Sequence, residues 1–575
     1  MKSCRKTFPV FLVKASLIFL SFFIAAKTKA QIGIGITTPD PSAMLHVQST
    51  DKGILIPRMT AAQRIAIATP AEGLQVYQTD AQNGFWYFTA GQWKPLVALN
   101  NGGKHTLYLA DGITNAEAAA KIATDVGPNT QEIRIVRCTN LTSVDLSMIT
   151  NLTEIYISNN PSLQSVNLDN LQSVDGGMYI TQCFKLTSML LSHLQHIGTS
   201  IYGTYGLTLQ YTHLPNLNLP ALVSINGITT LSYDSLMVSI NFTALTDVPN
   251  VFTLSYNVAL TSVSFAALTQ KGFQMDNCLN VNTVSVPVLA NGGINIFQNS
   301  ALTSLNFPAL RKGGIFLSSC TGLNNINFPV LDTTANSISL TNCPAISSIG
   351  FPVLKYGYLI CNNVGSLASL SFPALTTGSF SFSNMPSLNN LLCPLLSSGD
   401  FNITGVALTS LSMPALNSTQ GNGFTLSNCS ALSNISLPVL STSNFSITGC
   451  SALSTFTAPA LNTAGINLTG PSQLTSISLP SLTTLSSMFI NNHQNLASIS
   501  MDAMTSYTGT SSFGFFGCKL PSAQVNYLLH KLVLATPLIT GIDINLSQNP
   551  VAPPTGQGII DKATLVSRPN NVYTD

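Results

Sequence analysis

The feature that most constrains this chain is a short apolar pattern that returns about every 22 residues. One clear copy has apolar residues at positions 1, 4, 6 and 9, namely Leu302, Leu305, Phe307 and Leu310. The same spacing begins at 17 places, the first at Leu141 and the last at Leu496, so 16 steps cover 355 residues. A fixed period of this length is typical of a protein built from stacked repeats.

Each repeat has a second half in which apolar and polar residues alternate. After Leu310 the chain reads Gly313-Gly-Ile315-Phe-Leu317-Ser-Ser-Cys320, and Leu323 opens the next copy. Alternation with a period of two indicates a β-strand, and no copy contains the longer periodic pattern of a helix. A unit this short cannot bury its own apolar face, so the copies must stack on one another.

The sequence therefore predicts a mostly β fold, a right-handed leucine-rich-repeat-like β-helix solenoid of about 17 rungs. Positions 1, 4, 6 and 9 should point inward, and the Ser, Thr and Asn residues between them should face water. Proline follows position 6 in 11 of the 17 copies, as at Pro308 and Pro329. Because proline donates no backbone hydrogen bond, its recurrence predicts a corner where a strand has just ended.

This architecture explains a composition that otherwise suggests a membrane protein. Hydrophobic residues make up 45% of the 575 residues, and charged residues only 8%, against about 25% charged residues in an ordinary soluble protein. Beyond residue 30, however, no run approaches the roughly 20 apolar residues of a transmembrane helix. The chain also lacks the basic clusters of a nucleic-acid-binding protein, and it is too apolar for intrinsic disorder.

The first 30 residues have the pattern of an export signal. Four Lys or Arg residues precede the apolar stretch 15–26, and Ala30 is a small residue suited to cleavage before Gln31. This order is typical of a secretory signal peptide, and 12 apolar residues are too few for a membrane anchor. Cleavage would remove six basic residues and leave 17 basic and 21 acidic ones, a net charge of −4. We expect a secreted or cell-surface protein.

The repeats resemble the leucine-rich β-helix of the receptor L-domain family, and the likeness extends to leucine-rich surface proteins of Bacteroidetes-type bacteria. It is carried by runs such as Leu-x-x-Leu-x-Phe-Pro-x-Leu followed by Gly-x-Phe-x-Ile-x-Asn, over about 370 residues. The resemblance implies a β-solenoid whose role lies between a ligand-binding ectodomain and a structural wall protein. None of the family's ligand residues maps onto this sequence.

Residues 31–97 differ in character from the repeats. They contain Pro39-Asp-Pro41, the run Lys52-Gly-Ile-Leu-Ile-Pro57 and a hairpin-like segment with Trp86 and Trp93. The segment resembles an N-terminal module of bacterial surface proteins that is related to phage tail-fibre modules. This resemblance implies a small β-rich stalk or trimerisation element, and so a homotrimer. We expect the two tryptophans in the core of the module rather than as platforms for sugar stacking.

We predict five segments: a signal peptide (1–30), the N-terminal module (31–97), a linker and N-terminal cap (98–140), the leucine-rich β-solenoid (141–510) and an α/β C-terminal cap (511–575). In the first cap, residues 115–122 read as a short helix with Asn115 as its N-cap. In the second, residues 521–534 read as an amphipathic helix, and residues 541–546 as a last strand before another short helix. Solenoids need such caps to cover their end rungs.

Ten cysteines follow the predicted signal peptide, and seven of them share one repeat position just before the next leucine: Cys138, Cys183, Cys278, Cys320, Cys343, Cys429 and Cys450. Cys320 and Cys343 lie one rung apart, as do Cys429 and Cys450, so export would permit a disulfide within each pair. The favoured alternative is a column of unpaired, buried thiols. No Cys-x-x-Cys motif is present to suggest a metal or redox site.

The repeats contain little that indicates catalysis. Residues 141–510 carry five basic and ten acidic side chains, spread over many rungs, whereas polysaccharide-cleaving enzymes need such groups to converge. His193-x-x-His196 does not lie on a helical pattern. Motifs for a nucleophile elbow, a phosphate loop or a zinc protease are missing. We expect no catalytic residues, no metal and no cofactor.

The longest repeat holds the best candidates for ligand binding. The step from Leu186 to Leu214 is 28 residues long and includes Tyr202, Tyr205 and Tyr211. Insertions in solenoids fall on loop faces and often on the binding face, although a longer loop with structural tyrosines is the alternative. The sequence thus predicts adhesion or recognition of a glycan or protein ligand at the cell surface. A passive envelope spacer is the alternative, and a polysaccharide-active enzyme is a distant third.

Overall fold

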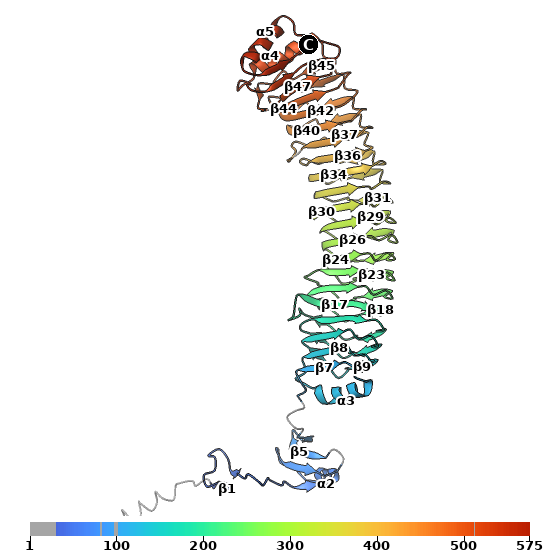
Figure 1. Cartoon of the computed structure of the whole chain (residues 1–575), viewed down its shortest axis with the longest axis vertical. Coiled ribbons are helices and arrows are strands. Elements are labelled where there is room, and N and C mark those ends of the chain that lie inside the picture. Colours follow the sequence, from blue (N-terminus) through green and yellow to red (C-terminus); the bar gives the residue numbers. More distant parts are fainter. Residues whose placement is uncertain (1–29, 81–82, 97–101, 422, 511) are drawn as a thin grey trace, which may run out of the picture. The chain divides into compact units, whose positions relative to one another are not determined.

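A computed structural model of the chain describes residues 30–80, 83–96, 102–421, 423–510 and 512–575 (Figure 1). The chain divides into two compact units between residues 101 and 102. The predicted signal peptide lies outside the described residues except for its last residue, Ala30.

Within its described residues, the first unit contains two small sheets and one short helix, α2 (Ala61–Ile65). One sheet pairs β1 (Ile32–Ile34) with β2 (Leu45–Val47), and the other has the order β3 (Arg58–Met59), β4 (Gln75–Gln78), β5 (Gly84–Thr89) and β6 (Gln92–Pro95). The predicted tryptophan hairpin is confirmed, because β5 and β6 are antiparallel and Phe88 lies opposite Trp93. Trp86 is buried, and the Arg64 guanidinium lies 3.7 Å from its ring centroid.

The second unit is a parallel β-solenoid of about 20 turns, which at about 4.8 Å per turn measures roughly 100 Å (Figure 1). Its main face is one long sheet with a strand from each turn. These strands are β7 (Thr106–Ala110), β8 (Glu132–Val136), β11 (Glu154–Ser158), β14 (Met178–Cys183), β17 (Tyr205–Thr212), β20 (Ile228–Ser232), β22 (Phe252–Ser255), β24 (Gln270–Asp276), β26 (Asn291–Phe297), β28 (Lys312–Ser318), β30 (Thr333–Thr341), β32 (Tyr356–Asn362), β34 (Thr377–Met385), β36 (Phe401–Val406), β38 (Phe424–Ser427), β40 (Thr442–Thr448), β42 (Thr463–Thr469), β44 (Thr484–Asn491), β46 (Ser506–Tyr507), β47 (Ser512–Phe516), β48 (Asp543–Asn545) and β49 (Asn571–Tyr573).

A second face is made of short strands, one in each of the 17 predicted copies. They are β9 (Ser143–Asp145), β12 (Ser165–Asn167), β15 (Ser188–Leu190), β18 (Asn216–Asn218), β21 (Ser239–Asn241), β23 (Ser262–Ser264), β25 (Thr283–Ser285), β27 (Ser304–Asn306), β29 (Asn325–Asn327), β31 (Ser348–Gly350), β33 (Ser369–Ser371), β35 (Asn390–Leu392), β37 (Ser410–Ser412), β39 (Asn434–Ser436), β41 (Thr455–Thr457), β43 (Ser476–Ser478) and β45 (Ser498–Ser500). The early turns add a third small sheet of β10 (Asn151–Leu152), β13 (Ser173–Val174), β16 (His196–Ile197) and β19 (Ser224–Ile225).

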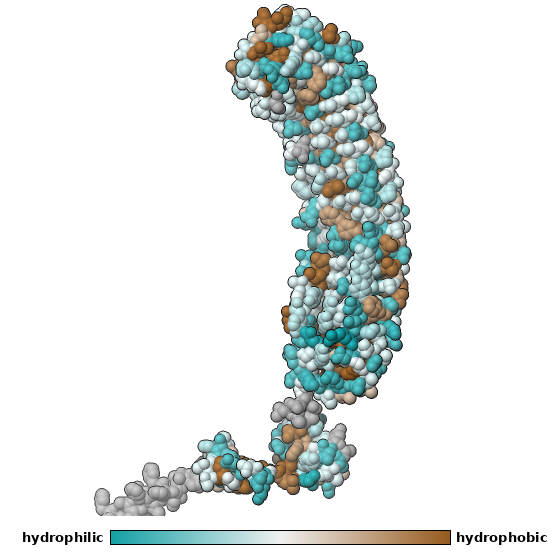
Figure 2. Space-filling view, in the orientation of Figure 1, coloured by the Kyte–Doolittle hydropathy of each residue, from teal (hydrophilic) through white to brown (hydrophobic). Residues whose placement is uncertain are grey.

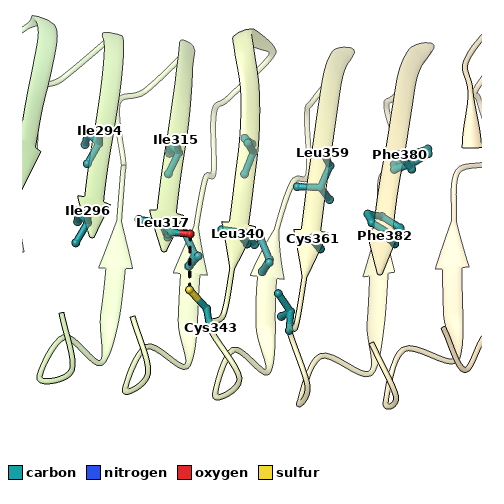
Figure 3. Packing of buried hydrophobic residues seen from close by; sticks show 14 of the residues in the cluster. Ile294, Ile296, Ile315, Leu317, Leu340, Cys343, Leu359, Cys361, Phe380 and Phe382 are labelled. Carbon is teal, nitrogen blue, oxygen red and sulfur yellow. Dashed lines mark hydrogen bonds between the residues drawn. The ribbon is translucent and has the colours of Figure 1, made fainter. Parts of the chain in front are cut away.

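The core is built as the repeat predicts. The four apolar positions of the copy that starts at Leu302 are each at most 2% exposed. At position 6, the rings of Phe307, Phe328, Phe351 and Phe372 form a stack with centroids 5.1–5.3 Å apart. The long-sheet strands supply the facing side chains, such as Ile294 and Ile315 (Figure 3). Proline after position 6 lies in the turn that follows each short strand, as predicted.

Outward Ser and Thr side chains form hydrogen bonds with the backbone of the neighbouring turns. The Thr261 hydroxyl donates to the Val238 carbonyl at 3.2 Å, and the Ser397 hydroxyl donates to the Thr376 carbonyl at 2.9 Å. Because neutral hydroxyl groups satisfy the outer carbonyls, the solenoid needs few charged residues. Figure 2 accordingly shows a pale to hydrophilic surface on which apolar residues form separate patches.

Each turn leaves the long sheet through one residue in the left-handed conformation. Asn277, Asn342 and Asn363 have φ angles of 53–57°, and Gly405 and Gly449 hold the same place in their turns. Asparagine and glycine enter this conformation at the lowest cost. The repeated Asn and Gly residues before the cysteine column therefore set the sharp bend of the coil.

The cysteine column follows directly after this bend. All ten described cysteines are buried and unpaired, so the alternative of a thiol column is confirmed. The Cys343 thiol, for example, lies 3.8 Å from the Leu317 carbonyl of the previous turn (Figure 3). Burial raises the pKa of the Cys138 and Cys278 thiols to about 11, and the scarcity of thiolate makes them poor nucleophiles.

Helices close both ends of the stack. α3 (Asn115–Asp125) and α4 (Ser522–Leu534) fall where the sequence predicts them, and α5 (Gln557–Ser567) follows. The buried face of α4 is the predicted one: Val525, Leu528, Leu529 and Leu532. In the described part of the chain, no helix has both the length and the apolar character needed to cross a bilayer.

Two expectations about the caps were wrong. The N-cap of α3 is Thr114 and not Asn115, because Thr114 and Glu117 form a reciprocal capping box. The Asn115 side chain instead accepts the Thr142 N–H at 2.8 Å and so ties the helix to the first repeat. β48 is not the last strand, since α5 returns the chain to the long sheet as β49. The caps thus add strands, and the stack is longer than the 17 copies.

Asp234 occupies the buried column after the left-handed bend, where the next turn has Asn257. The Asn257 amide donates to the Leu231 carbonyl at 2.9 Å, whereas Asp234 accepts the N–H and O–H of Thr212 through Oδ1 at 2.6 and 2.8 Å. Asp234 Oδ2 is buried with no hydrogen-bond partner among the described residues. Burial raises the pKa of this carboxyl to about 7. The protonated carboxyl can donate, as the asparagine amide does.

We expect Asp234→Asn to remove a pH dependence of stability. The pKa of Asp234 is about 7 in the folded protein against 3.8 for the ordinary carboxyl, so the folded state binds more protons between these values. Stability should therefore fall by a few kcal/mol as the pH rises from about 4 to about 7. In thermal unfolding, the midpoint temperature of the variant should rise relative to that of the wild type as the pH increases across this range. Asp332→Asn is the control, and a pH-independent difference would contradict the assignment.

Candidate ligand-binding face

Exposed aromatic side chains gather on the first third of the solenoid. Among the described residues of the second unit, eleven Tyr or Phe residues are exposed, and eight of them fall between residues 108 and 256: Tyr108, Tyr156, Phe184, Tyr202, Tyr205, Tyr211, Tyr233 and Tyr256. Together with Tyr179 we call these residues the tyrosine face. Such a concentration of exposed aromatic surface is typical of an interaction site.

The first column of the tyrosine face follows the register of the long sheet. Arg134 on β8, Tyr156 on β11 and Tyr179 on β14 are direct neighbours across the strands. The two tyrosine rings stack with centroids 4.9 Å apart and planes 10° apart. The Arg134 guanidinium lies 5.8 Å from the Tyr156 centroid, within range of a cation–π interaction. The strand spacing of about 4.8 Å suits flat rings, so the sheet itself aligns this column.

The insertion of the longest repeat folds back over this column. The Glu154 carboxylate accepts the Ile201 N–H at 2.7 Å and the Gly177 N–H at 3.0 Å. The Tyr202 hydroxyl donates to Glu132 at 3.0 Å, although the two residues are 70 positions apart. Both carboxylates are buried. Charge-assisted hydrogen bonds of this kind are stronger than neutral ones, and they hold the loop in place.

Glu132 connects the loop to the charged groups of the first turns. Its carboxylate lies 3.4 Å from Arg134 Nε and 3.8 Å from His105 Nε2, and it accepts the Thr106 hydroxyl at 3.2 Å. Burial opposes ionisation most strongly, but hydrogen bonds from Tyr202, Arg134 and Thr106 together lower the pKa of Glu132. The Arg134 guanidinium also lies 4.8 Å from the Tyr202 ring centroid. The ion pair of Arg134 and Glu132 therefore lies next to the exposed rings of Tyr156 and Tyr202.

The second column consists of Tyr211, Tyr233 and Tyr256. Their rings stack with centroids 4.7 and 4.8 Å apart and planes within 6°. All three occupy the left-handed bend, with φ of 55–60°, where a residue other than glycine costs about 1–3 kcal/mol. Aromatic stacking returns about 0.5–1.5 kcal/mol per pair. Asn or Gly occupies most of the other bends, so three successive tyrosines depart from the usual repeat.

The structure places the predicted candidates in two groups. Tyr202 and Tyr205 join the first column, where the Tyr205 hydroxyl donates to the Tyr202 carbonyl at 3.4 Å, while Tyr211 belongs to the second column. Sequence reasoning missed the other members and Arg134. Their signal was the repeat phase, since Tyr156 and Tyr179 are 23 residues apart and Tyr233 follows Tyr211 by 22.

The histidines near the long repeat are separately engaged. His193 Nδ1 lies 2.7 Å from the Asp169 carbonyl, and His196 Nδ1 lies 2.7 Å from the Ser224 hydroxyl. Among the residues that the structure describes, no three His, Cys, Asp or Glu side chains gather as a metal site would require. The groups that this face presents are aromatic, arginine and carboxylate side chains.

The fold and the repeats define a leucine-rich β-solenoid protein. Residues 250–356 and 355–467 match the family model described as a BspA type leucine rich repeat region, with six copies. The predicted leucine-rich resemblance is thus confirmed, and the matching model over residues 250–467 is the BspA type. Residues 33–111 match a second model, described as a phage tail like trimerisation region. No curated protein matches the chain.

Several solved structures are similar at low identity. A leucine-rich repeat protein from Bacteroides ovatus is 12% identical, with a TM-score of 0.25, and the match covers 70% of this chain and 86% of that one. A leucine rich cell surface protein from Faecalibacterium prausnitzii is 15% identical, with a TM-score of 0.21 and coverage of 64% and 93%. YopM from Yersinia enterocolitica is 16% identical, with a TM-score of 0.22 and coverage of 70% and 90%. TM-scores this low transfer no site residue.

We expect Glu154→Ala to loosen the loop over the first tyrosine column. The substitution leaves the Ile201 N–H without its acceptor, and a hydrogen bond to a charged group contributes about 1.5–3 kcal/mol. Amide hydrogen exchange at Ile201 should therefore accelerate at least about tenfold. Asp175→Ala, which removes an exposed carboxylate nearby, should leave Ile201 unchanged. Equal exchange in both variants would show that Glu154 does not anchor the loop.

Proposed function

We propose that the protein is an exported, non-catalytic repeat protein that acts in cell-surface adhesion or recognition of a glycan or protein ligand. The observation that supports this most directly is the gathering of exposed aromatic side chains between residues 108 and 256. The proposed binding surface is the tyrosine face. Export rests on the predicted signal peptide, with cleavage between Ala30 and Gln31.

The tyrosine face is already ordered without a partner, and this favours binding. Tyrosine and arginine are the residues that most often dominate interface energies. The stacked rings of Tyr156 and Tyr179, and the hydrogen-bonded Tyr202, are already held in place. A pre-ordered surface loses less conformational entropy when a partner binds, so more of the contact energy appears as affinity.

A passive envelope spacer is the second candidate. It is favoured by the turns from β23 to β31, where the outward residues of the short strands are Ser, Thr, Asn and Gly. A polysaccharide-active enzyme is a distant third, because the buried carboxylates nearest the tyrosine face, Glu132 and Glu154, are engaged in holding the loop. The spacer predicts no specific ligand, and the enzyme predicts turnover of a bound polysaccharide.

We further propose a homotrimer formed through the N-terminal unit. The match of residues 33–111 to a trimerisation region supports this assembly. Large apolar side chains of the unit are exposed, among them Ile32 at 60%, Leu55 at 83% and Ile65 at 69%. Soluble monomers seldom leave extensive apolar surface exposed to water. A trimer would also present three tyrosine faces, and multivalency strengthens weak binding.

Arrays of glycans and of surface proteins test the recognition proposal. We expect the purified protein to bind at least one array component, and Tyr156→Ala combined with Tyr179→Ala to weaken that binding at least about tenfold, since hot-spot truncations cost 1–2 kcal/mol or more. Tyr573→Ala, which removes an exposed ring at the far end of the sheet, is the control. Absence of any binding would favour the spacer, and equal binding by the double variant would mean that the ligand binds away from the tyrosine face.

Light scattering of the purified protein tests the trimer. We expect three times the chain mass, and we expect Leu55→Glu combined with Ile65→Glu to give a monomer because charge opposes burial of that surface. Leu395→Glu, at an exposed leucine of the solenoid, should remain trimeric. A wild-type protein that stays monomeric at micromolar concentration would refute the assembly.

A further inference from the structure

A second candidate site lies on the long sheet far along the chain from the tyrosine face. A groove of about 440 Å³ extends over β32, β34 and β36, a size within the range of about 300–1,000 Å³ for small-molecule sites. Its polar and aromatic lining includes Tyr356, Tyr358, Ser379, Asp400, Asn402 and Gln420. Tyr356 and Tyr358 are the two exposed aromatic residues of the second unit between residues 257 and 572.

Small outward side chains account for the hollow. The outward residues of β34 beside Tyr356 and Tyr358 are Thr377 and Ser379. Gly378 lies on the opposite, inward side of the same strand, where a Cβ atom would lie 2.9 Å from the Leu375 side chain in the core. The floor of the groove is therefore backbone and small hydroxyl side chains.

The two tyrosines of the groove differ from those of the tyrosine face. Their register partners on β34 are the small residues Thr377 and Ser379. Within the described chain, neither Tyr356 nor Tyr358 is stacked on another aromatic ring, and they are 52% and 41% exposed. The tyrosine columns contain stacked rings, whereas these two rings have small neighbours on β34. An exposed ring beside small residues is a surface that the apolar face of a ligand can contact.

Hydrogen bonds hold the polar side chains of the groove in place. The Gly423 N–H donates to Asp400 Oδ1 at 3.2 Å, and the Asp400 N–H donates to the Ser379 hydroxyl at 3.2 Å. The Gln420 amide donates to the Ser398 hydroxyl at 3.0 Å. Burial raises the pKa of Asp400, although backbone hydrogen bonds from Gly423 and Gln420 oppose the rise. Asp400 is the one charged residue among the lining residues, so the groove suits hydroxyl donors and carries no cation for an anionic ligand.

We propose that this groove is a binding site for a neutral saccharide. The apolar face of a sugar ring would lie against Tyr356 or Tyr358, and its hydroxyl groups would donate to the Asp400 carboxylate and exchange hydrogen bonds with Asn402 and Gln420. The site is separate from the tyrosine face and does not depend on the function proposed for that surface. The proposed ligand belongs to one chemical class, and it binds at one position on the solenoid.

Calorimetric titration of the full chain with four neutral hexasaccharides, of the cellulose, starch, β-1,3-glucan and mannan types, tests the proposal. We expect at least one to bind at millimolar concentration or below. Tyr358→Ala and Asp400→Asn should each lower the association constant at least about tenfold, the equivalent of 1.4 kcal/mol. Tyr358→Phe keeps the ring face and should retain binding.

The tyrosine-face variant, Tyr156→Ala with Tyr179→Ala, is the matched control and should bind the hexasaccharide as the wild type does. Circular dichroism must show that every variant keeps its β content. If none of the four sugars binds, or if the tyrosine-face variant loses binding while the groove variants keep it, the groove is not a saccharide site. The last result would instead assign sugar binding to the tyrosine face.

Discussion

Everything in the solenoid depends on the hydrogen bonds between the parallel strands of successive turns. No single 22-residue unit can pair its strand edges or bury its leucines alone, and both needs are met by the turns above and below. The strand spacing of about 4.8 Å then sets the distance between equivalent residues. Each repeat position therefore becomes a column of side chains, and the properties of the molecule are properties of these columns.

Each column has its usual residue type, and a few columns depart from it. Leucine and phenylalanine columns make the core, hydroxyl columns satisfy outer carbonyls, and Asn or Gly columns make the bends. Function is expected where a column departs from its usual residue without a structural need. Tyr211, Tyr233 and Tyr256 replace the usual residues of the bend, and Tyr356 and Tyr358 stand beside small neighbours.

The two candidate sites use the same sheet in different ways. In the tyrosine face the rings cover one another, so their edges, hydroxyl groups and the Arg134 charge are what a partner would meet. In the groove the two tyrosines lie beside the small residues Thr377 and Ser379. The first arrangement suits a broad surface contact, and the second suits a small ligand with an apolar face and hydroxyl groups.

Repeat periodicity was enough to predict the coil, its inward positions, its proline corners and the helical caps, because every copy of a repeat meets the same environment. The tyrosine columns also follow the repeat phase, since equivalent residues lie one above the other. Other features depend on contacts between distant turns. Tyr202 reaches Glu132 from 70 residues away, because the insertion finds its hydrogen-bond acceptors on Glu154 and Glu132 two and three turns earlier. The groove exists because Thr377 and Ser379 lie beside Tyr356 and Tyr358 on the neighbouring strand. A period along the sequence specifies neither the direction of a loop nor an empty space on a sheet.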